Sequence, residues 1–369
     1  MRHAVLSMSL LLAICGNVAL TQADEQGEYQ AAAGYSAPAE GNWVSSAFED
    51  DYDVVDPRYD WDLSRGAPPD INEFFAPPEY GTYLQADVLF LARAHSPNQT
   101  VAVTLPPASQ TILTADDASL TGNLQPGLMM TYGVRFDQVS ALELTFFGFN
   151  TWSGSAVAND GGQLSLPGTL PLITQDYIFA DRIKIDAESS IYNVEANYTQ
   201  TISGLKLLAG FRYLRLNDAF DINSTVDALN SSSDYNVWAK NNLIGGQIGM
   251  GFDWKWDRLT FDVIGKFGVY GNVAEQNTLL RDLNNTFIRR NFQDHTTVTS
   301  VIGEVGLNAS YQVLDWLAIR AGYRFMWINN VALAPDQLNF SSAPGAGSTA
   351  TASNHIFLNG VSVGLEARW

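Results

Sequence analysis

Fourteen of the charged side chains between residue 81 and the end of the chain lie between apolar or glycine neighbours in segments that alternate. Residues of one parity share one face of an extended strand, so these charges would face one common interior. Opposite charges at close range in a narrow, poorly hydrated space pair with one another, and we therefore expect an ion-pair network. A narrow pore in which Arg212, Arg320 and Arg324 favour anions stays open as the alternative. The predicted lumen-lining residues are the acidic Asp87, Glu143, Glu195, Asp262, Glu304 and Glu366 and the basic Arg93, Arg135, Lys206, Arg212, Lys266, Arg320, Arg324 and Arg368.

Histidines offer a different chemistry. His95, His295 and His355 follow the N-terminal apolar stretch, with Asp294 beside His295 and Ser353 near His355. Adjacency in sequence does not supply the hydrogen-bond geometry of a base and its nucleophile, and no nucleophile motif surrounds any serine. We therefore predict that the protein is not an enzyme. An outer-membrane hydrolase with a loop-borne histidine stays open as an alternative.

The charge balance and the motif content exclude several classes of function. The formal net charge is −19 and the sequence pI is about 4.4, whereas nucleic-acid binding needs a basic surface. The acidic run at residues 49–53 lacks the spaced ligands and central glycine of a calcium loop, and no zinc, phosphate or dinucleotide motif occurs. We expect no nucleic-acid partner, no metal and no cofactor.

The elements that must position the charges are strands. Residues 205–216 show the pattern, since Leu205, Leu207 and Phe211 alternate with Lys206 and Arg212. Period-two alternation of this kind predicts a strand with two different solvents on its two faces. The ten predicted strands span residues 83–94, 128–136, 141–149, 191–199, 205–216, 243–254, 259–270, 301–311, 316–327 and 355–369.

The connections between these strands decide the fold. Four short turns, at residues 137–140, 200–204, 255–257 and 312–315, alternate with long polar segments at 95–127, 151–190, 217–236, 272–298 and 328–354. This alternation is typical of an all-β, antiparallel, up-and-down transmembrane β-barrel with short periplasmic turns and long outer loops. Closure of the sheet satisfies the backbone groups that lipid cannot. We predict about 10 strands, or 12 if alternation at 182–186 and the apolar run at 101–105 belong to further hairpins.

The last strand ends the chain on an aromatic residue, after apolar residues at alternate positions. Leu365, Ala367 and Trp369 therefore resemble the assembly signal of bacterial outer-membrane barrels, which implies the barrel-assembly machinery and the lipid bilayer as partners.

The N-terminus predicts two further regions. A basic residue, a mostly apolar stretch and a small-residue site predict a signal peptide over residues 1–23, which contains Cys15, the one cysteine. Residues 24–80 hold 14 acidic and two basic residues and predict a mostly disordered periplasmic extension open to periplasmic or cell-wall contacts. The barrel would span residues 81–369, in the bacterial outer membrane.

Four segments resemble a known family. Residues 207–218 (LLAGFRYLRLND), 243–252 (LIGGQIGMGF), 303–312 (GEVGLNASYQ) and 319–338 (IRAGYRFMWINNVALAPDQL) are similar to the β-barrel porin-7 family of planctomycete-type bacteria. The resemblance implies an outer-membrane barrel and carries no substrate or catalytic residue with it. We expect a structural or narrow porin-like barrel with a charged lumen, with a non-conducting surface anchor or adhesin using long outer loops as the alternative.

Overall fold

The computed structural model describes residues 81–94, 98–106, 109–118 and 120–369. The predicted signal peptide (1–23), the predicted extension (24–80) and His95 lie outside the described residues. None of the helices in the described part of the chain is long and apolar enough to cross a bilayer.

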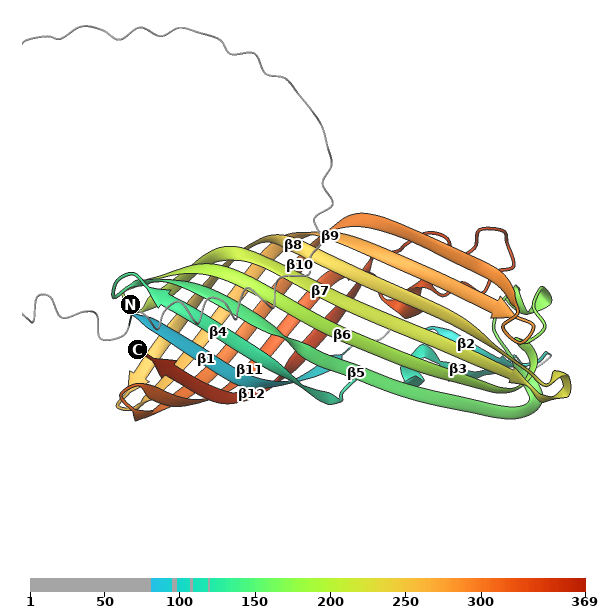
Figure 1. Cartoon of the computed structure of the whole chain (residues 1–369), viewed down its shortest axis with the longest axis horizontal. Helices are drawn as coiled ribbons and strands as arrows, with labels where there is room; N and C mark the ends of the chain where they lie inside the picture. The colour runs from blue at the N-terminus through green and yellow to red at the C-terminus, as the bar shows by residue number, and fades with distance from the viewer. Residues whose placement is uncertain (1–80, 95–97, 107–108, 119) are drawn as a thin grey trace, which may run out of the picture. The chain divides into compact units, whose positions relative to one another are not determined.

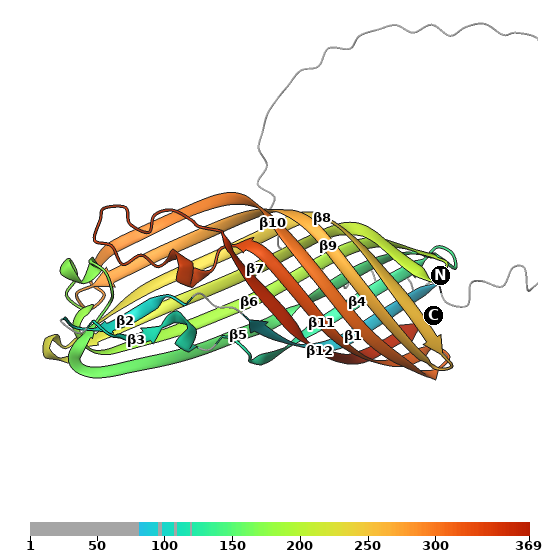
Figure 2. The ribbon, with the colours of Figure 1, turned by 180° about the vertical axis from the view of Figure 1, so that it is seen from behind.

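Ten antiparallel strands close into a barrel, which confirms the predicted fold class (Figure 1). Each strand pairs with its neighbour along the chain, apart from the inserted β2 and β3, and β12 pairs with β1 to close the ring (Figure 2). The amide of Trp369 donates to the carbonyl of Thr82 at 3.0 Å, so the closure extends to the last residue. The barrel strands are β1 (Thr82–Ala94), β4 (Leu124–Arg135), β5 (Ser140–Ser165), β6 (Ile178–Ile202), β7 (Leu205–Val226), β8 (Ser231–Trp256), β9 (Leu259–Asp282), β10 (Phe287–Leu314), β11 (Leu317–Val331) and β12 (Asn354–Arg368).

A short hairpin and four 3-10 helices complete the described elements. Strands β2 (Thr100–Thr104) and β3 (Thr111–Thr114) pair with each other, and β2 also pairs with β5. The short apolar run predicted at 101–105 therefore forms a hairpin that is not a barrel strand. The 3-10 helices are η1 (Ala115–Ala118), η2 (Leu170–Leu172), η3 (Asp227–Leu229) and η4 (Ala334–Gln337).

The strands run much further than the sequence predicts, and this corrects three predicted loops. Segments 151–190, 217–236 and 272–298 consist largely of the continuing strands β5 to β10, which reach 22 to 28 residues. These strands extend well beyond β1, β4, β11 and β12 at the end of the barrel away from the C-terminus (Figure 1). We name this the loop end, and the end with the short turns the turn end.

Strand β7 shows how the same sheet serves two environments. Its inward side chains change from charged Lys206 and Arg212 to apolar Leu216 and Phe220, and the register stays continuous on both sides. Its outward side chains change in the opposite sense, from Leu205, Leu207, Ala209, Phe211 and Tyr213 to Arg215, Asn217, Asp221, Asn223 and Thr225. The turn-end half thus has the polarity of a membrane barrel, and the loop-end half has that of a water-soluble one.

A layer of buried side chains fills the barrel where this change is complete. Nine consecutive strands, β5 to β12 and then β1, each contribute an inward side chain that is at most 1% exposed. A water-filled path through the layer would leave some of these side chains accessible to water, so the packing closes the lumen at this level. The dry layer consists of Leu91, Trp152, Ile191, Leu216, Leu243, Tyr270, Ser300, Ile328 and Leu358.

The connection between β11 and β12 closes the loop-end half further. Residues 331–340, which we call the plug, place Ala332 and Leu333 at 0% exposure. Asn241 donates to the carbonyl of Ala332 at 2.8 Å and accepts from its amide at 2.7 Å. The side chain of Asn272 donates to the carbonyl of Asn330 at 3.0 Å. These bonds satisfy backbone groups that burial would otherwise leave unpaired.

Candidate functional site in the barrel lumen

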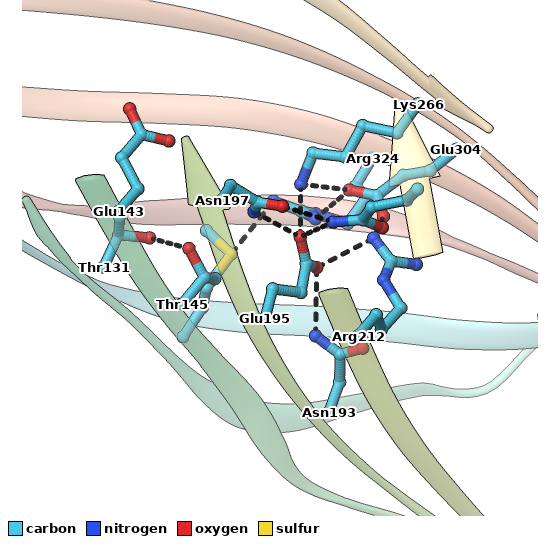
Figure 3. A network of polar contacts seen from close by, with 12 residues as sticks. Thr131, Glu143, Thr145, Asn193, Glu195, Asn197, Arg212, Lys266, Glu304 and Arg324 are labelled. Atoms are coloured by element: carbon cyan, nitrogen blue, oxygen red, sulfur yellow. Dashed lines mark hydrogen bonds and ion pairs between the residues drawn. The ribbon is translucent and has the colours of Figure 1, made fainter. Parts of the chain in front are cut away.

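Five charged side chains from five strands meet in the turn-end half of the lumen (Figure 3). The Nη2 atom of Arg212 lies 2.8 Å from Glu195 and 2.5 Å from Glu304. The Nζ atom of Lys266 lies 2.8 Å from Glu195 and 3.5 Å from Glu304, and Arg324 pairs with Glu304. Arg212 on β7 reaches Glu304 on β10 across the lumen, because two strands separate them in the sheet.

Neutral side chains complete the surroundings of Glu195. Asn193 donates to Oε1 of Glu195 at 3.0 Å, and Asn197 and Gln247 donate to Oε2 at 3.0 Å and 2.9 Å. With both oxygens bonded several times, the buried carboxylate is compensated for the loss of water. The Nε and Nη1 atoms of Arg212 have no hydrogen-bond partner among the described residues.

Two smaller clusters lie nearer the turn end. Glu143 accepts from Lys206 at 2.7 Å and from the hydroxyl of Tyr83 at 2.6 Å. Glu366 accepts from Arg320 at 3.1 Å and from Arg368 at 2.5 Å. The buried Asp87 lies 3.9 Å from Arg320. Asp262 accepts from Asn308 at 2.9 Å.

These clusters line a polar cavity of about 240 Å³. Its wall includes residues next to the short turns, so it opens at the turn end, while the dry layer closes the lumen towards the loop end. The charged residues of the wall are Arg135, Glu143, Lys206, Asp253, Lys255, Asp262, Lys266, Arg320, Arg324, Glu366 and Arg368.

Two predicted lumen residues lie apart from these ion-pair clusters. Arg135 is exposed at the end of β4, with its guanidinium 5.5 Å from the ring centre of Tyr83. Arg93 is fully buried in the loop-end half, where it pairs with Asp218 at 2.6 Å. The second oxygen of Asp218 accepts from the amide of Ala334, which links this ion pair to the plug.

The predicted assembly residues lie on the outer face of β12 and at the end of the chain. Leu365 and Trp369 are exposed and Ala367 is half-buried. They thereby continue the outward apolar row of the turn-end half.

In the part of the chain that the structure describes, Asp294 and His295 lack the arrangement of a hydrolase. Asp294 points into the barrel, where it accepts from the amide of Ala350 at 2.8 Å, whereas the neighbouring His295 is exposed on the outer face. Backbone amides of Ala350 and His295 lower the pKa of Asp294. Since adjacent residues of a strand face opposite sides, Asp294 cannot orient the His295 ring from within β10.

Sequence reasoning missed the polar network at the loop end. Asp176 is fully buried and accepts from the hydroxyl of Ser231 and the amide of Asn284, both at 2.8 Å. Asp282 accepts from Arg289 at 2.7 Å. These bonds tie three hairpin ends together. Buried Ile183 and Ile185 alternate with charged neighbours, and this pattern indicates that the strand continues towards the loop end. From the sequence alone it was assigned only to a possible further hairpin.

A family model, "Putative beta barrel porin-7", matches residues 92–369 of the chain. A search of curated proteins finds no match.

Several solved barrels are similar in structure. The outer membrane protease OmpT from Escherichia coli is 10% identical with a TM-score of 0.41, and the match covers 79% of this chain and 97% of that one. The Neisserial surface protein A is 11% identical with a TM-score of 0.25 (78% and 97% covered). The toluene transporter TodX of P. putida is 9% identical with a TM-score of 0.31 (80% and 91% covered). Their different names assign no common activity.

Proposed function

Because the chain belongs to the beta barrel porin-7 family, we propose that it is a non-conducting barrel of the bacterial outer membrane that holds a rigid β-cylinder above the bilayer. The dry layer carries this proposal, since ions need a continuous path of water or polar groups. We therefore favour a structural role over a narrow anion-selective pore.

The outer face supports the proposed placement in the membrane. On β7 the apolar outward row runs from Leu205 to Tyr213, which is nine residues, and a membrane-spanning β-strand needs about 9–11 residues. The remaining 13 residues of β7 would extend about 40 Å along the strand beyond the bilayer at the usual rise per residue. Strand β12 with the following Trp369 would be the segment that the assembly machinery recognises.

The experiment is single-channel recording in a planar bilayer with the refolded chain that begins at residue 24. Folding is checked first by heat-modifiable migration on a gel, and a general porin inserted by the same procedure is the positive control. We expect no discrete conductance steps from folded protein. Reproducible steps with an anion-selective reversal potential would reject the proposal and favour the narrow pore.

If the folded barrel gives no conductance, we favour a surface-anchor role, in which the cylinder presents its loop end. The hydrolase alternative has less support, since Asp294 and His295 face opposite sides of β10.

A further inference from the structure

The positive charge of this acidic protein is concentrated around one cavity. The chain has 20 lysines and arginines against 39 aspartates and glutamates. Seven of these basic residues but only four of the acidic residues line the polar cavity, so its wall carries a formal charge of +3. In a chain with a net charge of −19, composition alone predicts more acidic than basic residues in the wall of a cavity.

The acidic residues behind the wall do not cancel this charge. Glu195, Glu304, Asp87 and Arg212 lie next to the wall, and including them reduces the formal sum from +3 to +1. The oxygens of Glu195 and Glu304 already accept from Arg212, Lys266 and other donors. They are therefore turned towards existing partners, and the wall together with the residues behind it keeps a formal charge of +1.

The mouth of the cavity holds two cations without an ion-pair partner among the described residues, and Asp253 in the same wall forms no ion pair either. Among the described residues, neither Arg135 nor Lys255 forms an ion pair or a side-chain hydrogen bond, whereas Lys206, Lys266 and Arg324 each pair with a glutamate. Thr260 and Ser310 add hydroxyl groups to the same wall. A recess with low-dielectric walls focuses the field of such charges and raises the local concentration of counter-ions.

We propose that this cavity is a binding site for a small multivalent anion, of the phosphate or polycarboxylate class, that enters from the turn end. Cations from β4, β7, β8, β9, β11 and β12 surround the space, so an anion with several charges can contact more than one strand. The hydroxyl groups would donate to its remaining oxygens. The site depends only on the cavity and its charges, not on the closure of the loop-end half.

Isothermal titration of the refolded chain in zwitterionic detergent, with inorganic pyrophosphate as the probe, tests this site. We expect binding of one pyrophosphate per chain, weaker at higher salt. The double variant R135Q/K255Q removes two exposed cations that hold no strand together, so it should fold normally. It should bind roughly tenfold more weakly, given the size of a screened charge–charge interaction. R182Q/K184Q, which removes two cations from the outer face near the loop end, is the matched control and should bind as the unmodified chain does.

Several results would overturn the site. These are absence of binding by folded protein, equal affinity for a neutral disaccharide, or equal losses in the two double variants. The outcome is independent of the conductance experiment. Binding with a silent bilayer supports both proposals, and a silent bilayer without binding rejects the anion site alone. Conductance together with binding rejects only the non-conducting function.

Discussion

The buried pair of Arg93 and Asp218 tests the dry interior of the loop-end half. The two side chains are each 1% exposed and 2.6 Å apart. Arg93 lies on β1 and Asp218 on β7, and three strands separate them in the sheet, so the pair crosses the barrel. Removing one member leaves the other as an uncompensated buried charge, which costs about 3–5 kcal/mol.

The double variant should recover most of this loss. In R93M/D218N neither side chain is charged, and the amide oxygen of the introduced asparagine would still accept from the backbone amide of Ala334, as Asp218 does at 2.9 Å. The Nε and Nη2 atoms of Arg93 have no hydrogen-bond partner among the described residues, so the native arginine is itself incompletely compensated. Replacement of a buried pair by neutral groups is often close to neutral, and we expect a coupling free energy of about 4 kcal/mol or more.

The assay is urea unfolding from lipid vesicles, followed by tryptophan fluorescence, for R93M, D218N and the double variant. The exposed pair of Lys184 and Asp186, 2.8 Å apart with side chains 41% and 44% exposed, is the matched control. K184M and D186N should show a coupling below about 1 kcal/mol, as exposed pairs do. If R93M and D218N add within about 0.5 kcal/mol, water reaches the pair and the reasoning fails.

Three further predictions concern the two faces of the barrel strands, the pairing of Trp369 with Thr82, and the connection between β11 and β12. V263R, on the outer face, should destabilise the barrel by about 2–4 kcal/mol in vesicle unfolding, more than S310R in the polar cavity, and equal losses would contradict the assignment of the two faces. Deletion of Trp369 should slow assembly more than W369A, because the deletion also removes backbone bonds to Thr82, and equal rates of folded-band formation would assign the effect to the indole alone. The pKa of Asp294 is lowered by backbone amides, so the stabilisation from its hydrogen bond with the amide of Ala350 is fully present above the ordinary aspartate pKa and is lost as pH falls through the lowered pKa. The hydrogen-exchange protection factors of residues 341–353, which correct for the intrinsic pH dependence of amide exchange, should therefore fall in acid, and D294N should reduce that pH dependence.

The part of the fold that the sequence predicts is the part inside the membrane. There, lipid requires apolar side chains at the outward positions, such as Leu207 and Phe211, while inward positions carry charged residues such as Arg212. The alternation of the two kinds is therefore clear in the sequence. Turn lengths add the up-and-down order, because a short connection can join only neighbouring antiparallel strands.

The loop-end half escaped prediction because its outward positions carry the polar residues typical of a water-facing surface. Polar residues such as Asn217, Asp221 and Asn223 then occupy outward positions of β7, and their density suggests loops. The inward row of Leu216 and Phe220 keeps the same parity as Arg212, and that continuity was the available signal. The plug could not be predicted, because its bonds to Asn241 join residues 91 positions apart in the sequence, and the bond from Asn272 to the neighbouring Asn330 joins residues 58 positions apart.

The number of strands sets the width of the lumen, and this width decides whether inward side chains can close it. The interior of a barrel of about eight strands is filled by side chains, whereas 16 to 18 strands leave an aqueous channel. With ten strands, the apolar inward rows of the loop-end half can meet across the lumen and exclude water. In the turn-end half, charged residues occupy the same width, and their need for partners and water leaves the cavity open at one end. The same narrow cylinder therefore closes where its inner face is apolar and leaves a cavity where that face is charged.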